Sequence, residues 1–160
     1  MSVRDVVIQA DAARVIEDIL RRFVSEAEVA DAFVIDRSGQ LLVRHGRGSA
    51  LDSVSISALA AGAFSSTAAM AQLLGEPEFS VLFHEGSKQN IHVSTIDEHS
   101  ILLAIFDGHT PIGLVRLYAK DASQAIAAAL SQAATRPRPG EELAQALAAT
   151  EAQIAFGKAS

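Results

Sequence analysis

Residues 53–75 read SVSISALAAGAFSSTAAMAQLLG, and this stretch decides the fold. It carries no charged side chain over a length that allows about six turns of α-helix. A helix with one face in water normally has polar and charged residues on that face, so a helix without charge all round is expected to be covered all round. A domain of this size has only two or three layers. We therefore expect one face of the helix to pack on a sheet and the other to contact a second polypeptide.

Projection at 100° per residue divides this helix, expected from about Leu51 to Leu74, into two faces. The face with the larger aliphatic side chains is expected to lie on the sheet, and it comprises Leu51, Ile56, Leu59, Met70, Leu73 and Leu74. The opposite face is rich in small residues, which would let another helix approach closely, with Phe64 as its one large anchor. This predicted interface face comprises Ser53, Ser57, Ala60, Ala61, Phe64, Ala68 and Ala71.

The same stretch is long enough to span a bilayer. Its serines, threonine, glutamine and glycines insert poorly into hydrocarbon, and it has few large aliphatic residues. We expect a buried helix of a soluble domain and no membrane insertion.

The rest of the chain alternates strand and helix patterns around this helix. An amphipathic helix over residues 11–28 comes first, and a hairpin follows in which Asp36–Gln40 joins two short apolar runs. Gly75-Glu76-Pro77 ends the central helix. The remaining expected elements are three strands around residues 79–84, 91–95 and 101–106, a helix after Thr110-Pro111, a Pro-rich linker over 136–140 and an alanine-rich helix over 141–156.

Composition excludes several classes of function. The 160 residues are 49% hydrophobic, so they can bury a core, and the net charge of −6 argues against a general nucleic-acid binder. The chain has no cysteine, which excludes disulfides and thiolate chemistry and suits a reducing cytosol. No P-loop or nucleophile-elbow motif is present, and the five histidines lack metal-ligand spacing. His84 and His92 are expected on facing strands, where a sheet-surface pair is commoner than a metal site. We expect no cofactor, no metal and no catalytic residues.

Several sequence strings, taken in order, resemble one family. Together with the order helix, two strands, helix, three strands, helix, they are similar to the roadblock (dynein light chain) domain, a profilin-like α/β (α+β) sandwich. The strings that look like its bacterial MglB branch are Phe33–Leu42, Leu59–Gly62, Leu74–Phe79, Phe83–Gly86, Ile105–Asp107 and Ile112–Leu117. The resemblance covers residues 10–134 as the roadblock domain and leaves residues 135–160 as a linker and helical tail.

The resemblance implies an architecture and a role. The sheet would have five antiparallel strands in the order 2-1-5-4-3, with the central helix on one face and the terminal helices on the other. Two copies would dimerise through the central helix and the third strand, to which Phe79 and Val81 belong. The homodimer would present a composite surface to one Ras-like small GTPase, similar to MglA, and activate GTP hydrolysis by stabilising the GTPase's own catalytic residues. Such a protein would act in cell polarity and gliding motility, in the cytoplasm and concentrated at a pole.

Two alternatives stay open from the sequence. A scaffold dimer that recruits a GTPase or a polar assembly without activating it shares every feature above. A small-molecule sensor of the kind built on similar sheets would need a roomy pocket, whereas the Phe and Leu content predicts a filled core.

Overall fold

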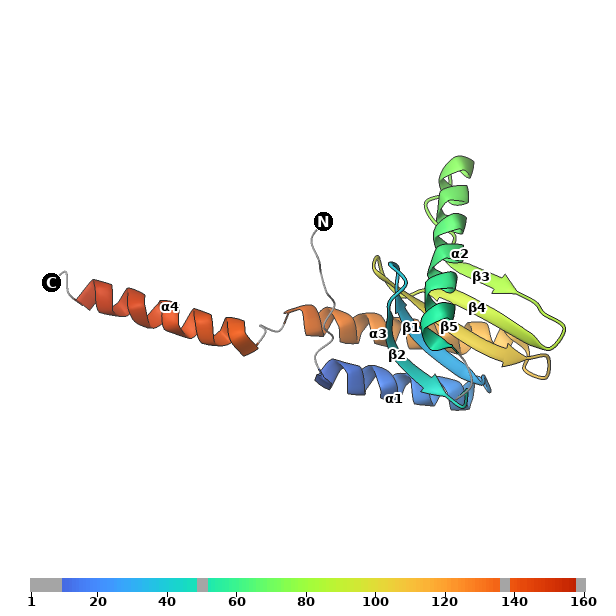
Figure 1. Cartoon of the computed structure of the whole chain (residues 1–160), viewed down its shortest axis with the longest axis horizontal. Helices are drawn as coiled ribbons and strands as arrows, with labels where there is room; N and C mark the ends of the chain where they lie inside the picture. The colour runs from blue at the N-terminus through green and yellow to red at the C-terminus, as the bar shows by residue number, and fades with distance from the viewer. Residues whose placement is uncertain (1–9, 49–51, 136–138, 158–160) are drawn as a thin grey trace.

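The structure is a computed structural model that describes residues 10–48, 52–135 and 139–157. Its elements follow the order that the sequence predicts (Figure 1). They are α1 (Ala10–Glu26), β1 (Asp31–Asp36), β2 (Leu41–Gly46), α2 (Ser53–Leu74), β3 (Val81–His84), β4 (Gln89–Thr95), β5 (Ser100–Asp107), α3 (Ile112–Thr135) and α4 (Pro139–Gly157).

The five strands form one antiparallel sheet in the order β2-β1-β5-β4-β3. Helix α2 lies on one face, and α1 and α3 lie on the other (Figure 1). The expected fold class, strand order and placement of helices are therefore confirmed. β5 lies at the centre of the sheet, and its run of buried residues matches a strand that is covered on both faces.

Alternate residues of the strands supply two separate cores. On β5, Leu102, Ala104 and Phe106 face α1 and α3, whereas Leu103 and Ile105 face α2. The core on the α1–α3 side is the larger of the two. The α2 side is built from sheet side chains with Ala60, Ala61 and Phe64 of the helix.

The first hairpin approaches α2 closely at its turn. Gly39 has φ +101°, and a Cβ at this position would lie 3.1 Å from the Cα of Ala58. Both the backbone angle and the close contact favour glycine here. The antiparallel pairing of the first two strands that the sequence predicts is confirmed, with a register irregularity between Val34 and Ile35.

Both ends of α2 are capped by their own residues. Asp52 is the N-cap, and its carboxylate accepts hydrogen bonds from the backbone N–H of Ser55 at 3.1 Å and from the hydroxyl of Ser55 at 2.7 Å. Gly75 ends the helix in the left-handed conformation, at φ +74°. The helix thus begins at Ser53, and Leu51, its expected first residue, lies outside the described residues.

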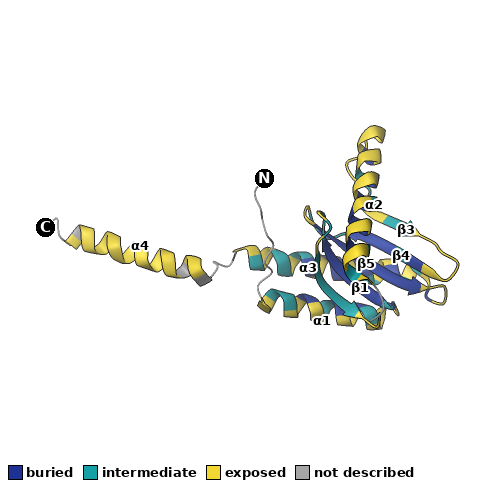
Figure 2. Ribbon diagram, viewed as in Figure 1, coloured by how far each residue is buried: buried dark blue, intermediate teal, exposed yellow. Residues whose placement is uncertain are grey.

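The prediction of which face of α2 contacts the sheet is wrong. The buried residues of α2 are Ser57, Ala60, Ala61, Phe64, Thr67 and Ala71, whereas Leu59, Met70, Leu73 and Leu74 are exposed. Of the residues expected on the sheet, Ile56 alone among the described ones packs against that core, and it is half-buried. The physical reason is that the sheet supplies the bulk: Phe33, Leu103 and Ile105 fill the layer, so the helix needs small side chains to come close. Figure 2 shows the resulting line of exposed residues along the outer side of α2.

The tail contains the helix that the sequence predicts there. α4 is exposed along its described residues, including Leu143, Leu147 and Ile154 (Figure 2). The assignment of residues 135–160 to a separate tail stays a prediction.

Candidate interaction surface

The side of α2 that points away from the sheet is an uncharged apolar surface. Its central residues follow spacings of four and three along the helix, so they form one stripe. We call this stripe, with the neighbouring Met70, the outer face of α2, and it consists of Ser55, Leu59, Gly62, Ser66, Ala69, Met70 and Leu73. Leu73 is 88% exposed and Leu59 is 72% exposed, whereas side chains of this kind are normally found in cores.

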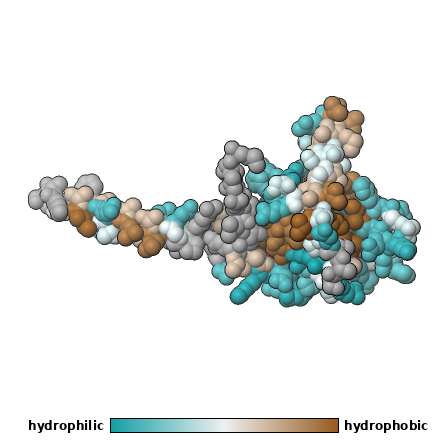
Figure 3. Space-filling view, in the orientation of Figure 1, coloured by the Kyte–Doolittle hydropathy of each residue, from teal (hydrophilic) through white to brown (hydrophobic). Residues whose placement is uncertain are grey.

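The outer face extends beyond the sheet. Figure 1 shows the C-terminal half of α2 rising past the strands, and Figure 3 shows hydrophobic residues gathered at its free end. Leu73 and Leu74 lie there and are largely exposed. Contiguous apolar surface of this kind is typical of a protein–protein or membrane contact.

Gly62 lies in the middle of the outer face, eight residues or more from either end of α2. A glycine inside a helix costs about 1 kcal/mol relative to alanine. A Cβ at position 62 would meet no atom within 4 Å in this chain. The monomer therefore gives no steric reason for the glycine, whereas a second helix packed across the outer face would.

A cluster around Arg37 holds the inner side of α2 on the sheet. The Arg37 guanidinium lies 5.5 Å from the centre of the Phe64 ring, donates to the carboxylate of Glu78 at 2.7 Å and donates to the carbonyl of Asp97 at 3.0 Å. These contacts join the first hairpin, α2, the segment after α2 and the β4–β5 turn. The position of the outer face is thus fixed by the folded chain itself.

The structure places the predicted interface residues of α2 mainly on the inner side. Ala60, Ala61 and Phe64 are buried against the sheet of their own chain. Ser57 and Ala71 are also buried, so none of the five forms an accessible surface. The neighbouring Ala68 is half-buried. These residues are therefore not the accessible side of α2, and the exposed leucines were the signal that pointed to the other side.

The third strand is an edge of the sheet. β3 begins at Val81, two residues later than expected, and Phe79 lies before it and is half-buried. Val81 is 41% exposed and lies opposite Ser94, so its side chain is on the α3 side of the sheet. β3 pairs with β4 alone among the described strands, which leaves its other edge free for a further strand.

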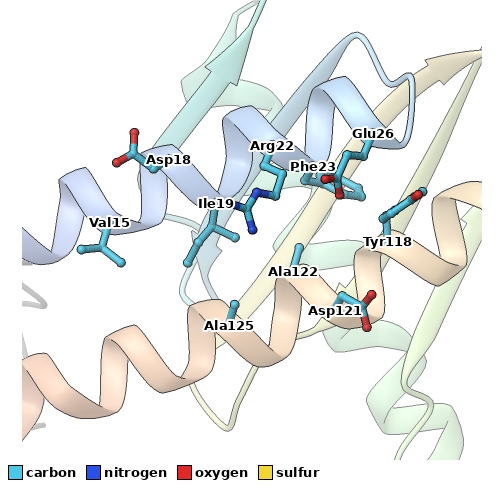
Figure 4. Close-up of a pocket in the computed structure, with 10 residues that line it drawn as sticks. All are labelled: Val15, Asp18, Ile19, Arg22, Phe23, Glu26, Tyr118, Asp121, Ala122 and Ala125. Atoms are coloured by element: carbon cyan, nitrogen blue, oxygen red, sulfur yellow. The ribbon is translucent and has the colours of Figure 1, made fainter.

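A groove of ≈ 390 Å³ lies between α1 and α3 on the opposite face of the molecule (Figure 4). Val15, Ile19 and Ala122 contribute apolar lining, and charged side chains of both signs stand at its rim. This mixture selects no single sign of charge in a ligand.

The described histidines do not form a metal site. His92 lies opposite Phe83, so His84 and His92 project to opposite faces of the sheet, and the expected facing pair does not form. Within the described ranges no three His, Asp or Glu side chains come together.

Helix α2 is the one described helix that is long and apolar enough to cross a membrane, with a mean hydropathy of 1.4. The core helix of a soluble protein can be equally long and apolar. α2 does contribute buried residues to the core, among them Phe64 at 2% exposure. Length and composition alone therefore do not distinguish a lipid contact from a protein contact at its outer face.

The fold and the exposed helix define a class of protein. The chain belongs to the Roadblock/LC7 domain family, whose pattern matches residues 15–106.

Within solved structures the chain is similar to three MglB structures. It is 32% identical to MglB of Myxococcus xanthus, with a TM-score of 0.71 over 73% of this chain and 95% of that one. It is 29% identical to the gliding protein MglB of Thermus thermophilus, with a TM-score of 0.74 over 79% and 96%. An MglB structure described as a tetrameric arrangement is 28% identical, with a TM-score of 0.75 over 79% and 96%. No match is found among curated protein sequences.

Proposed function

We propose that this protein is a homodimeric regulator of a Ras-like small GTPase, and that it acts as a GTPase-activating protein. The observation that carries the proposal is the uncharged outer face of α2, exposed in a chain that is similar to MglB along almost the whole of MglB's length. A second copy of the same helix would cover this face, with Gly62 at the closest approach of the two backbones.

The free edge of β3 supports the same arrangement. Two antiparallel edges from two copies would extend the sheet across the dimer, and the two outer faces of α2 would lie beside each other on one side of it. Val81 and the neighbouring Phe79 would then lie near the junction. The pair of α2 helices forms the surface offered to the GTPase.

The activating mechanism would be differential binding. The dimer would favour the GTPase conformation in which the switch loops and the attacking water are aligned, and this lowers the barrier to hydrolysis without a catalytic residue from this chain. The working compartment would be the cytoplasm, in agreement with the absence of cysteine from the sequence.

A scaffold dimer that binds the GTPase without activating it is the second candidate. It shares the outer face and the fold, so only the rate of GTP hydrolysis distinguishes the two candidates. In a single-turnover assay with the Ras-like protein of the same organism, the GTPase-activating role predicts faster GTP hydrolysis when the wild-type chain is added. Binding with an unchanged hydrolysis rate would support the scaffold instead, and absence of binding would refute both.

A further inference from the structure

A second and larger groove, of ≈ 880 Å³, lies between α3 and the β3 edge of the sheet. It exists because α1 packs over β1 and β2 and α3 packs over β4 and β5, so the groove opens beside α3 toward β3. Its floor is β4, and its wall is the side of α3 that carries Arg116, Lys120 and Gln124. The sequence predicted a filled core and no roomy pocket, so this groove is an unexpected feature.

His92 lies in the floor of this groove with its ring unpaired. It is 1% exposed, and neither Nδ1 nor Nε2 has a hydrogen-bond partner within the part of the chain that the structure describes. An unpaired buried polar group costs about 1–3 kcal/mol, so buried imidazoles normally have a partner. The other four histidines, all within the described ranges, are half-buried or exposed. The sheet neighbours of His92 are Phe83 and Ala104, neither of which has a polar side-chain atom to offer.

The charges around the groove have one sign. Arg116 and Lys120, one helical turn apart on α3, both line it, and neither forms an ion pair with a described residue. No carboxylate is among the described residues that line it. Glu78, which accepts a hydrogen bond from the lining residue Thr95 at 3.4 Å, is already paired with Arg37. The charged side chains of the wall are thus both cationic, in a chain of net charge −6.

The remaining lining is hydroxyl-rich at the base and apolar at the sides. Ser94 and Ser123 lie 3.5 Å apart between the strand and the helix, and Ser80 also lines the groove. Apolar contact surface comes from Val81 and Ile96. Donors at the base, cations on the wall and apolar sides together fit a small organic oxyanion with an apolar body.

We infer that this groove is a binding site for a small organic oxyanion, a carboxylate or a phosphate monoester, which the His92 imidazole and the Arg116 and Lys120 cations hold together. One ring nitrogen of the neutral His92 donates to an oxygen of the ligand, and the two α3 side chains neutralise its charge. The site is on the face opposite α2. It therefore does not depend on the proposed contact with a GTPase.

The pKa of the His92 imidazole should show whether a ligand occupies the groove. Burial, with the Arg116 charge as a second cause, lowers the pKa of His92 to about 4. Arg116 and Lys120 of α3 are the charged groups that face it in the groove, and β3 and β5 place Phe83 and Ala104 beside it. An oxyanion next to the ring favours the protonated form, so binding must raise this pKa.

The test is a histidine-resolved NMR titration of the full chain with phenyl phosphate, benzoate and inorganic phosphate at constant ionic strength. We expect saturable shifts of the His92 ring signals with phenyl phosphate or benzoate, at millimolar Kd or tighter, and an upward shift of the His92 pKa. The tighter of the two probes identifies the ligand class, and inorganic phosphate, which lacks an apolar body, should bind more weakly than phenyl phosphate.

A pair of charge-matched variants makes the test specific. Arg116→Gln with Lys120→Gln should weaken binding about tenfold or more, because it removes the two cations that neutralise the ligand's charge. Both side chains are exposed, so the variant should still fold. Arg14→Gln with Arg22→Gln removes the same charge from exposed positions on α1 and should leave binding unchanged. His92 signals that do not move with either organic probe, or that move equally in both double variants, would overturn the proposal. GTPase activation is measured separately, so its failure would leave this result standing.

Discussion

Replacing Gly62 by alanine should change folding and self-association in opposite directions. In the monomer a Cβ at position 62 meets no atom within 4 Å, so the methyl group costs no steric energy. Alanine is favoured over glycine inside a helix by about 0.8–1 kcal/mol. Gly62→Ala should therefore raise the free energy of unfolding of the isolated chain by roughly that amount.

In the proposed dimer the same methyl group would lie where two helix backbones meet. Extra atoms in a closely packed contact cost about 1–3 kcal/mol, and a twofold-symmetric interface contains the substitution twice. The expected loss is about 2–6 kcal/mol of association energy, which corresponds to a Kd at least about 30-fold higher.

The two effects are measured under different conditions. Urea unfolding at a protein concentration below the Kd gives the stability of the chain, and sedimentation equilibrium over a concentration series gives the Kd. Gly113→Ala is the matched control, because a Cβ at this helical glycine of α3 would also meet no atom within 4 Å, and α3 lies on the opposite face of the sheet. It should leave the Kd unchanged. A Gly62→Ala chain that self-associates as tightly as the wild type would refute the placement of the interface.

Three further changes separate the outer face, the inner face and the buried histidine. Leu73→Asp should abolish dimer formation and GTPase activation without loss of fold, because Leu73 is 88% exposed. The control Leu117→Asp, on the exposed side of α3, should change neither dimer formation nor activation. Size-exclusion chromatography with light scattering distinguishes monomer from dimer for both variants. Phe64→Ala should instead lower the free energy of unfolding by about 3–5 kcal/mol, because the ring is 2% exposed and packs between α2 and the sheet; a Kd change without loss of stability would contradict this. Because burial lowers the pKa of His92 to about 4 from 6.5, the unfolded chain binds more protons between these values, so stability should be complete above pH 6.5 and fall by at most about 3 kcal/mol as the pH drops to 4. His92→Gln should remove this part of the pH dependence, and urea unfolding at pH 7 and pH 4.5 measures it.

The sequence alone predicted the order of the helices and strands, and it identified α2 as the helix without charged residues. Alternation of apolar residues, the turn at Gly39 and the stop at Gly75 are local signals, and each one corresponds to a local backbone requirement. Strand order came from the family resemblance, because no local pattern states which strands lie side by side.

The sequence could not orient α2. Hydrophobic residues are spread nearly evenly around this helix, so periodicity does not distinguish its two faces. Which face packs inward depends on how much space the sheet leaves, and Phe33 and Leu103 fill that space from the other side. The groove at His92 was missed for a similar reason, since it forms between segments that are distant in sequence.

The most direct test is a crosslinking experiment that would join two copies of the chain through the outer face of α2. The chain contains no cysteine, so a single Ser66→Cys substitution introduces the only thiol, on the exposed side of α2 one turn from Gly62. Treatment with a short bismaleimide crosslinker should convert this variant to a covalent dimer at dilute concentration. Ser131→Cys, exposed on α3, should not be crosslinked under the same treatment. Equal crosslinking of the two variants, or none with Ser66→Cys, would contradict the claim that a second copy covers the outer face of α2.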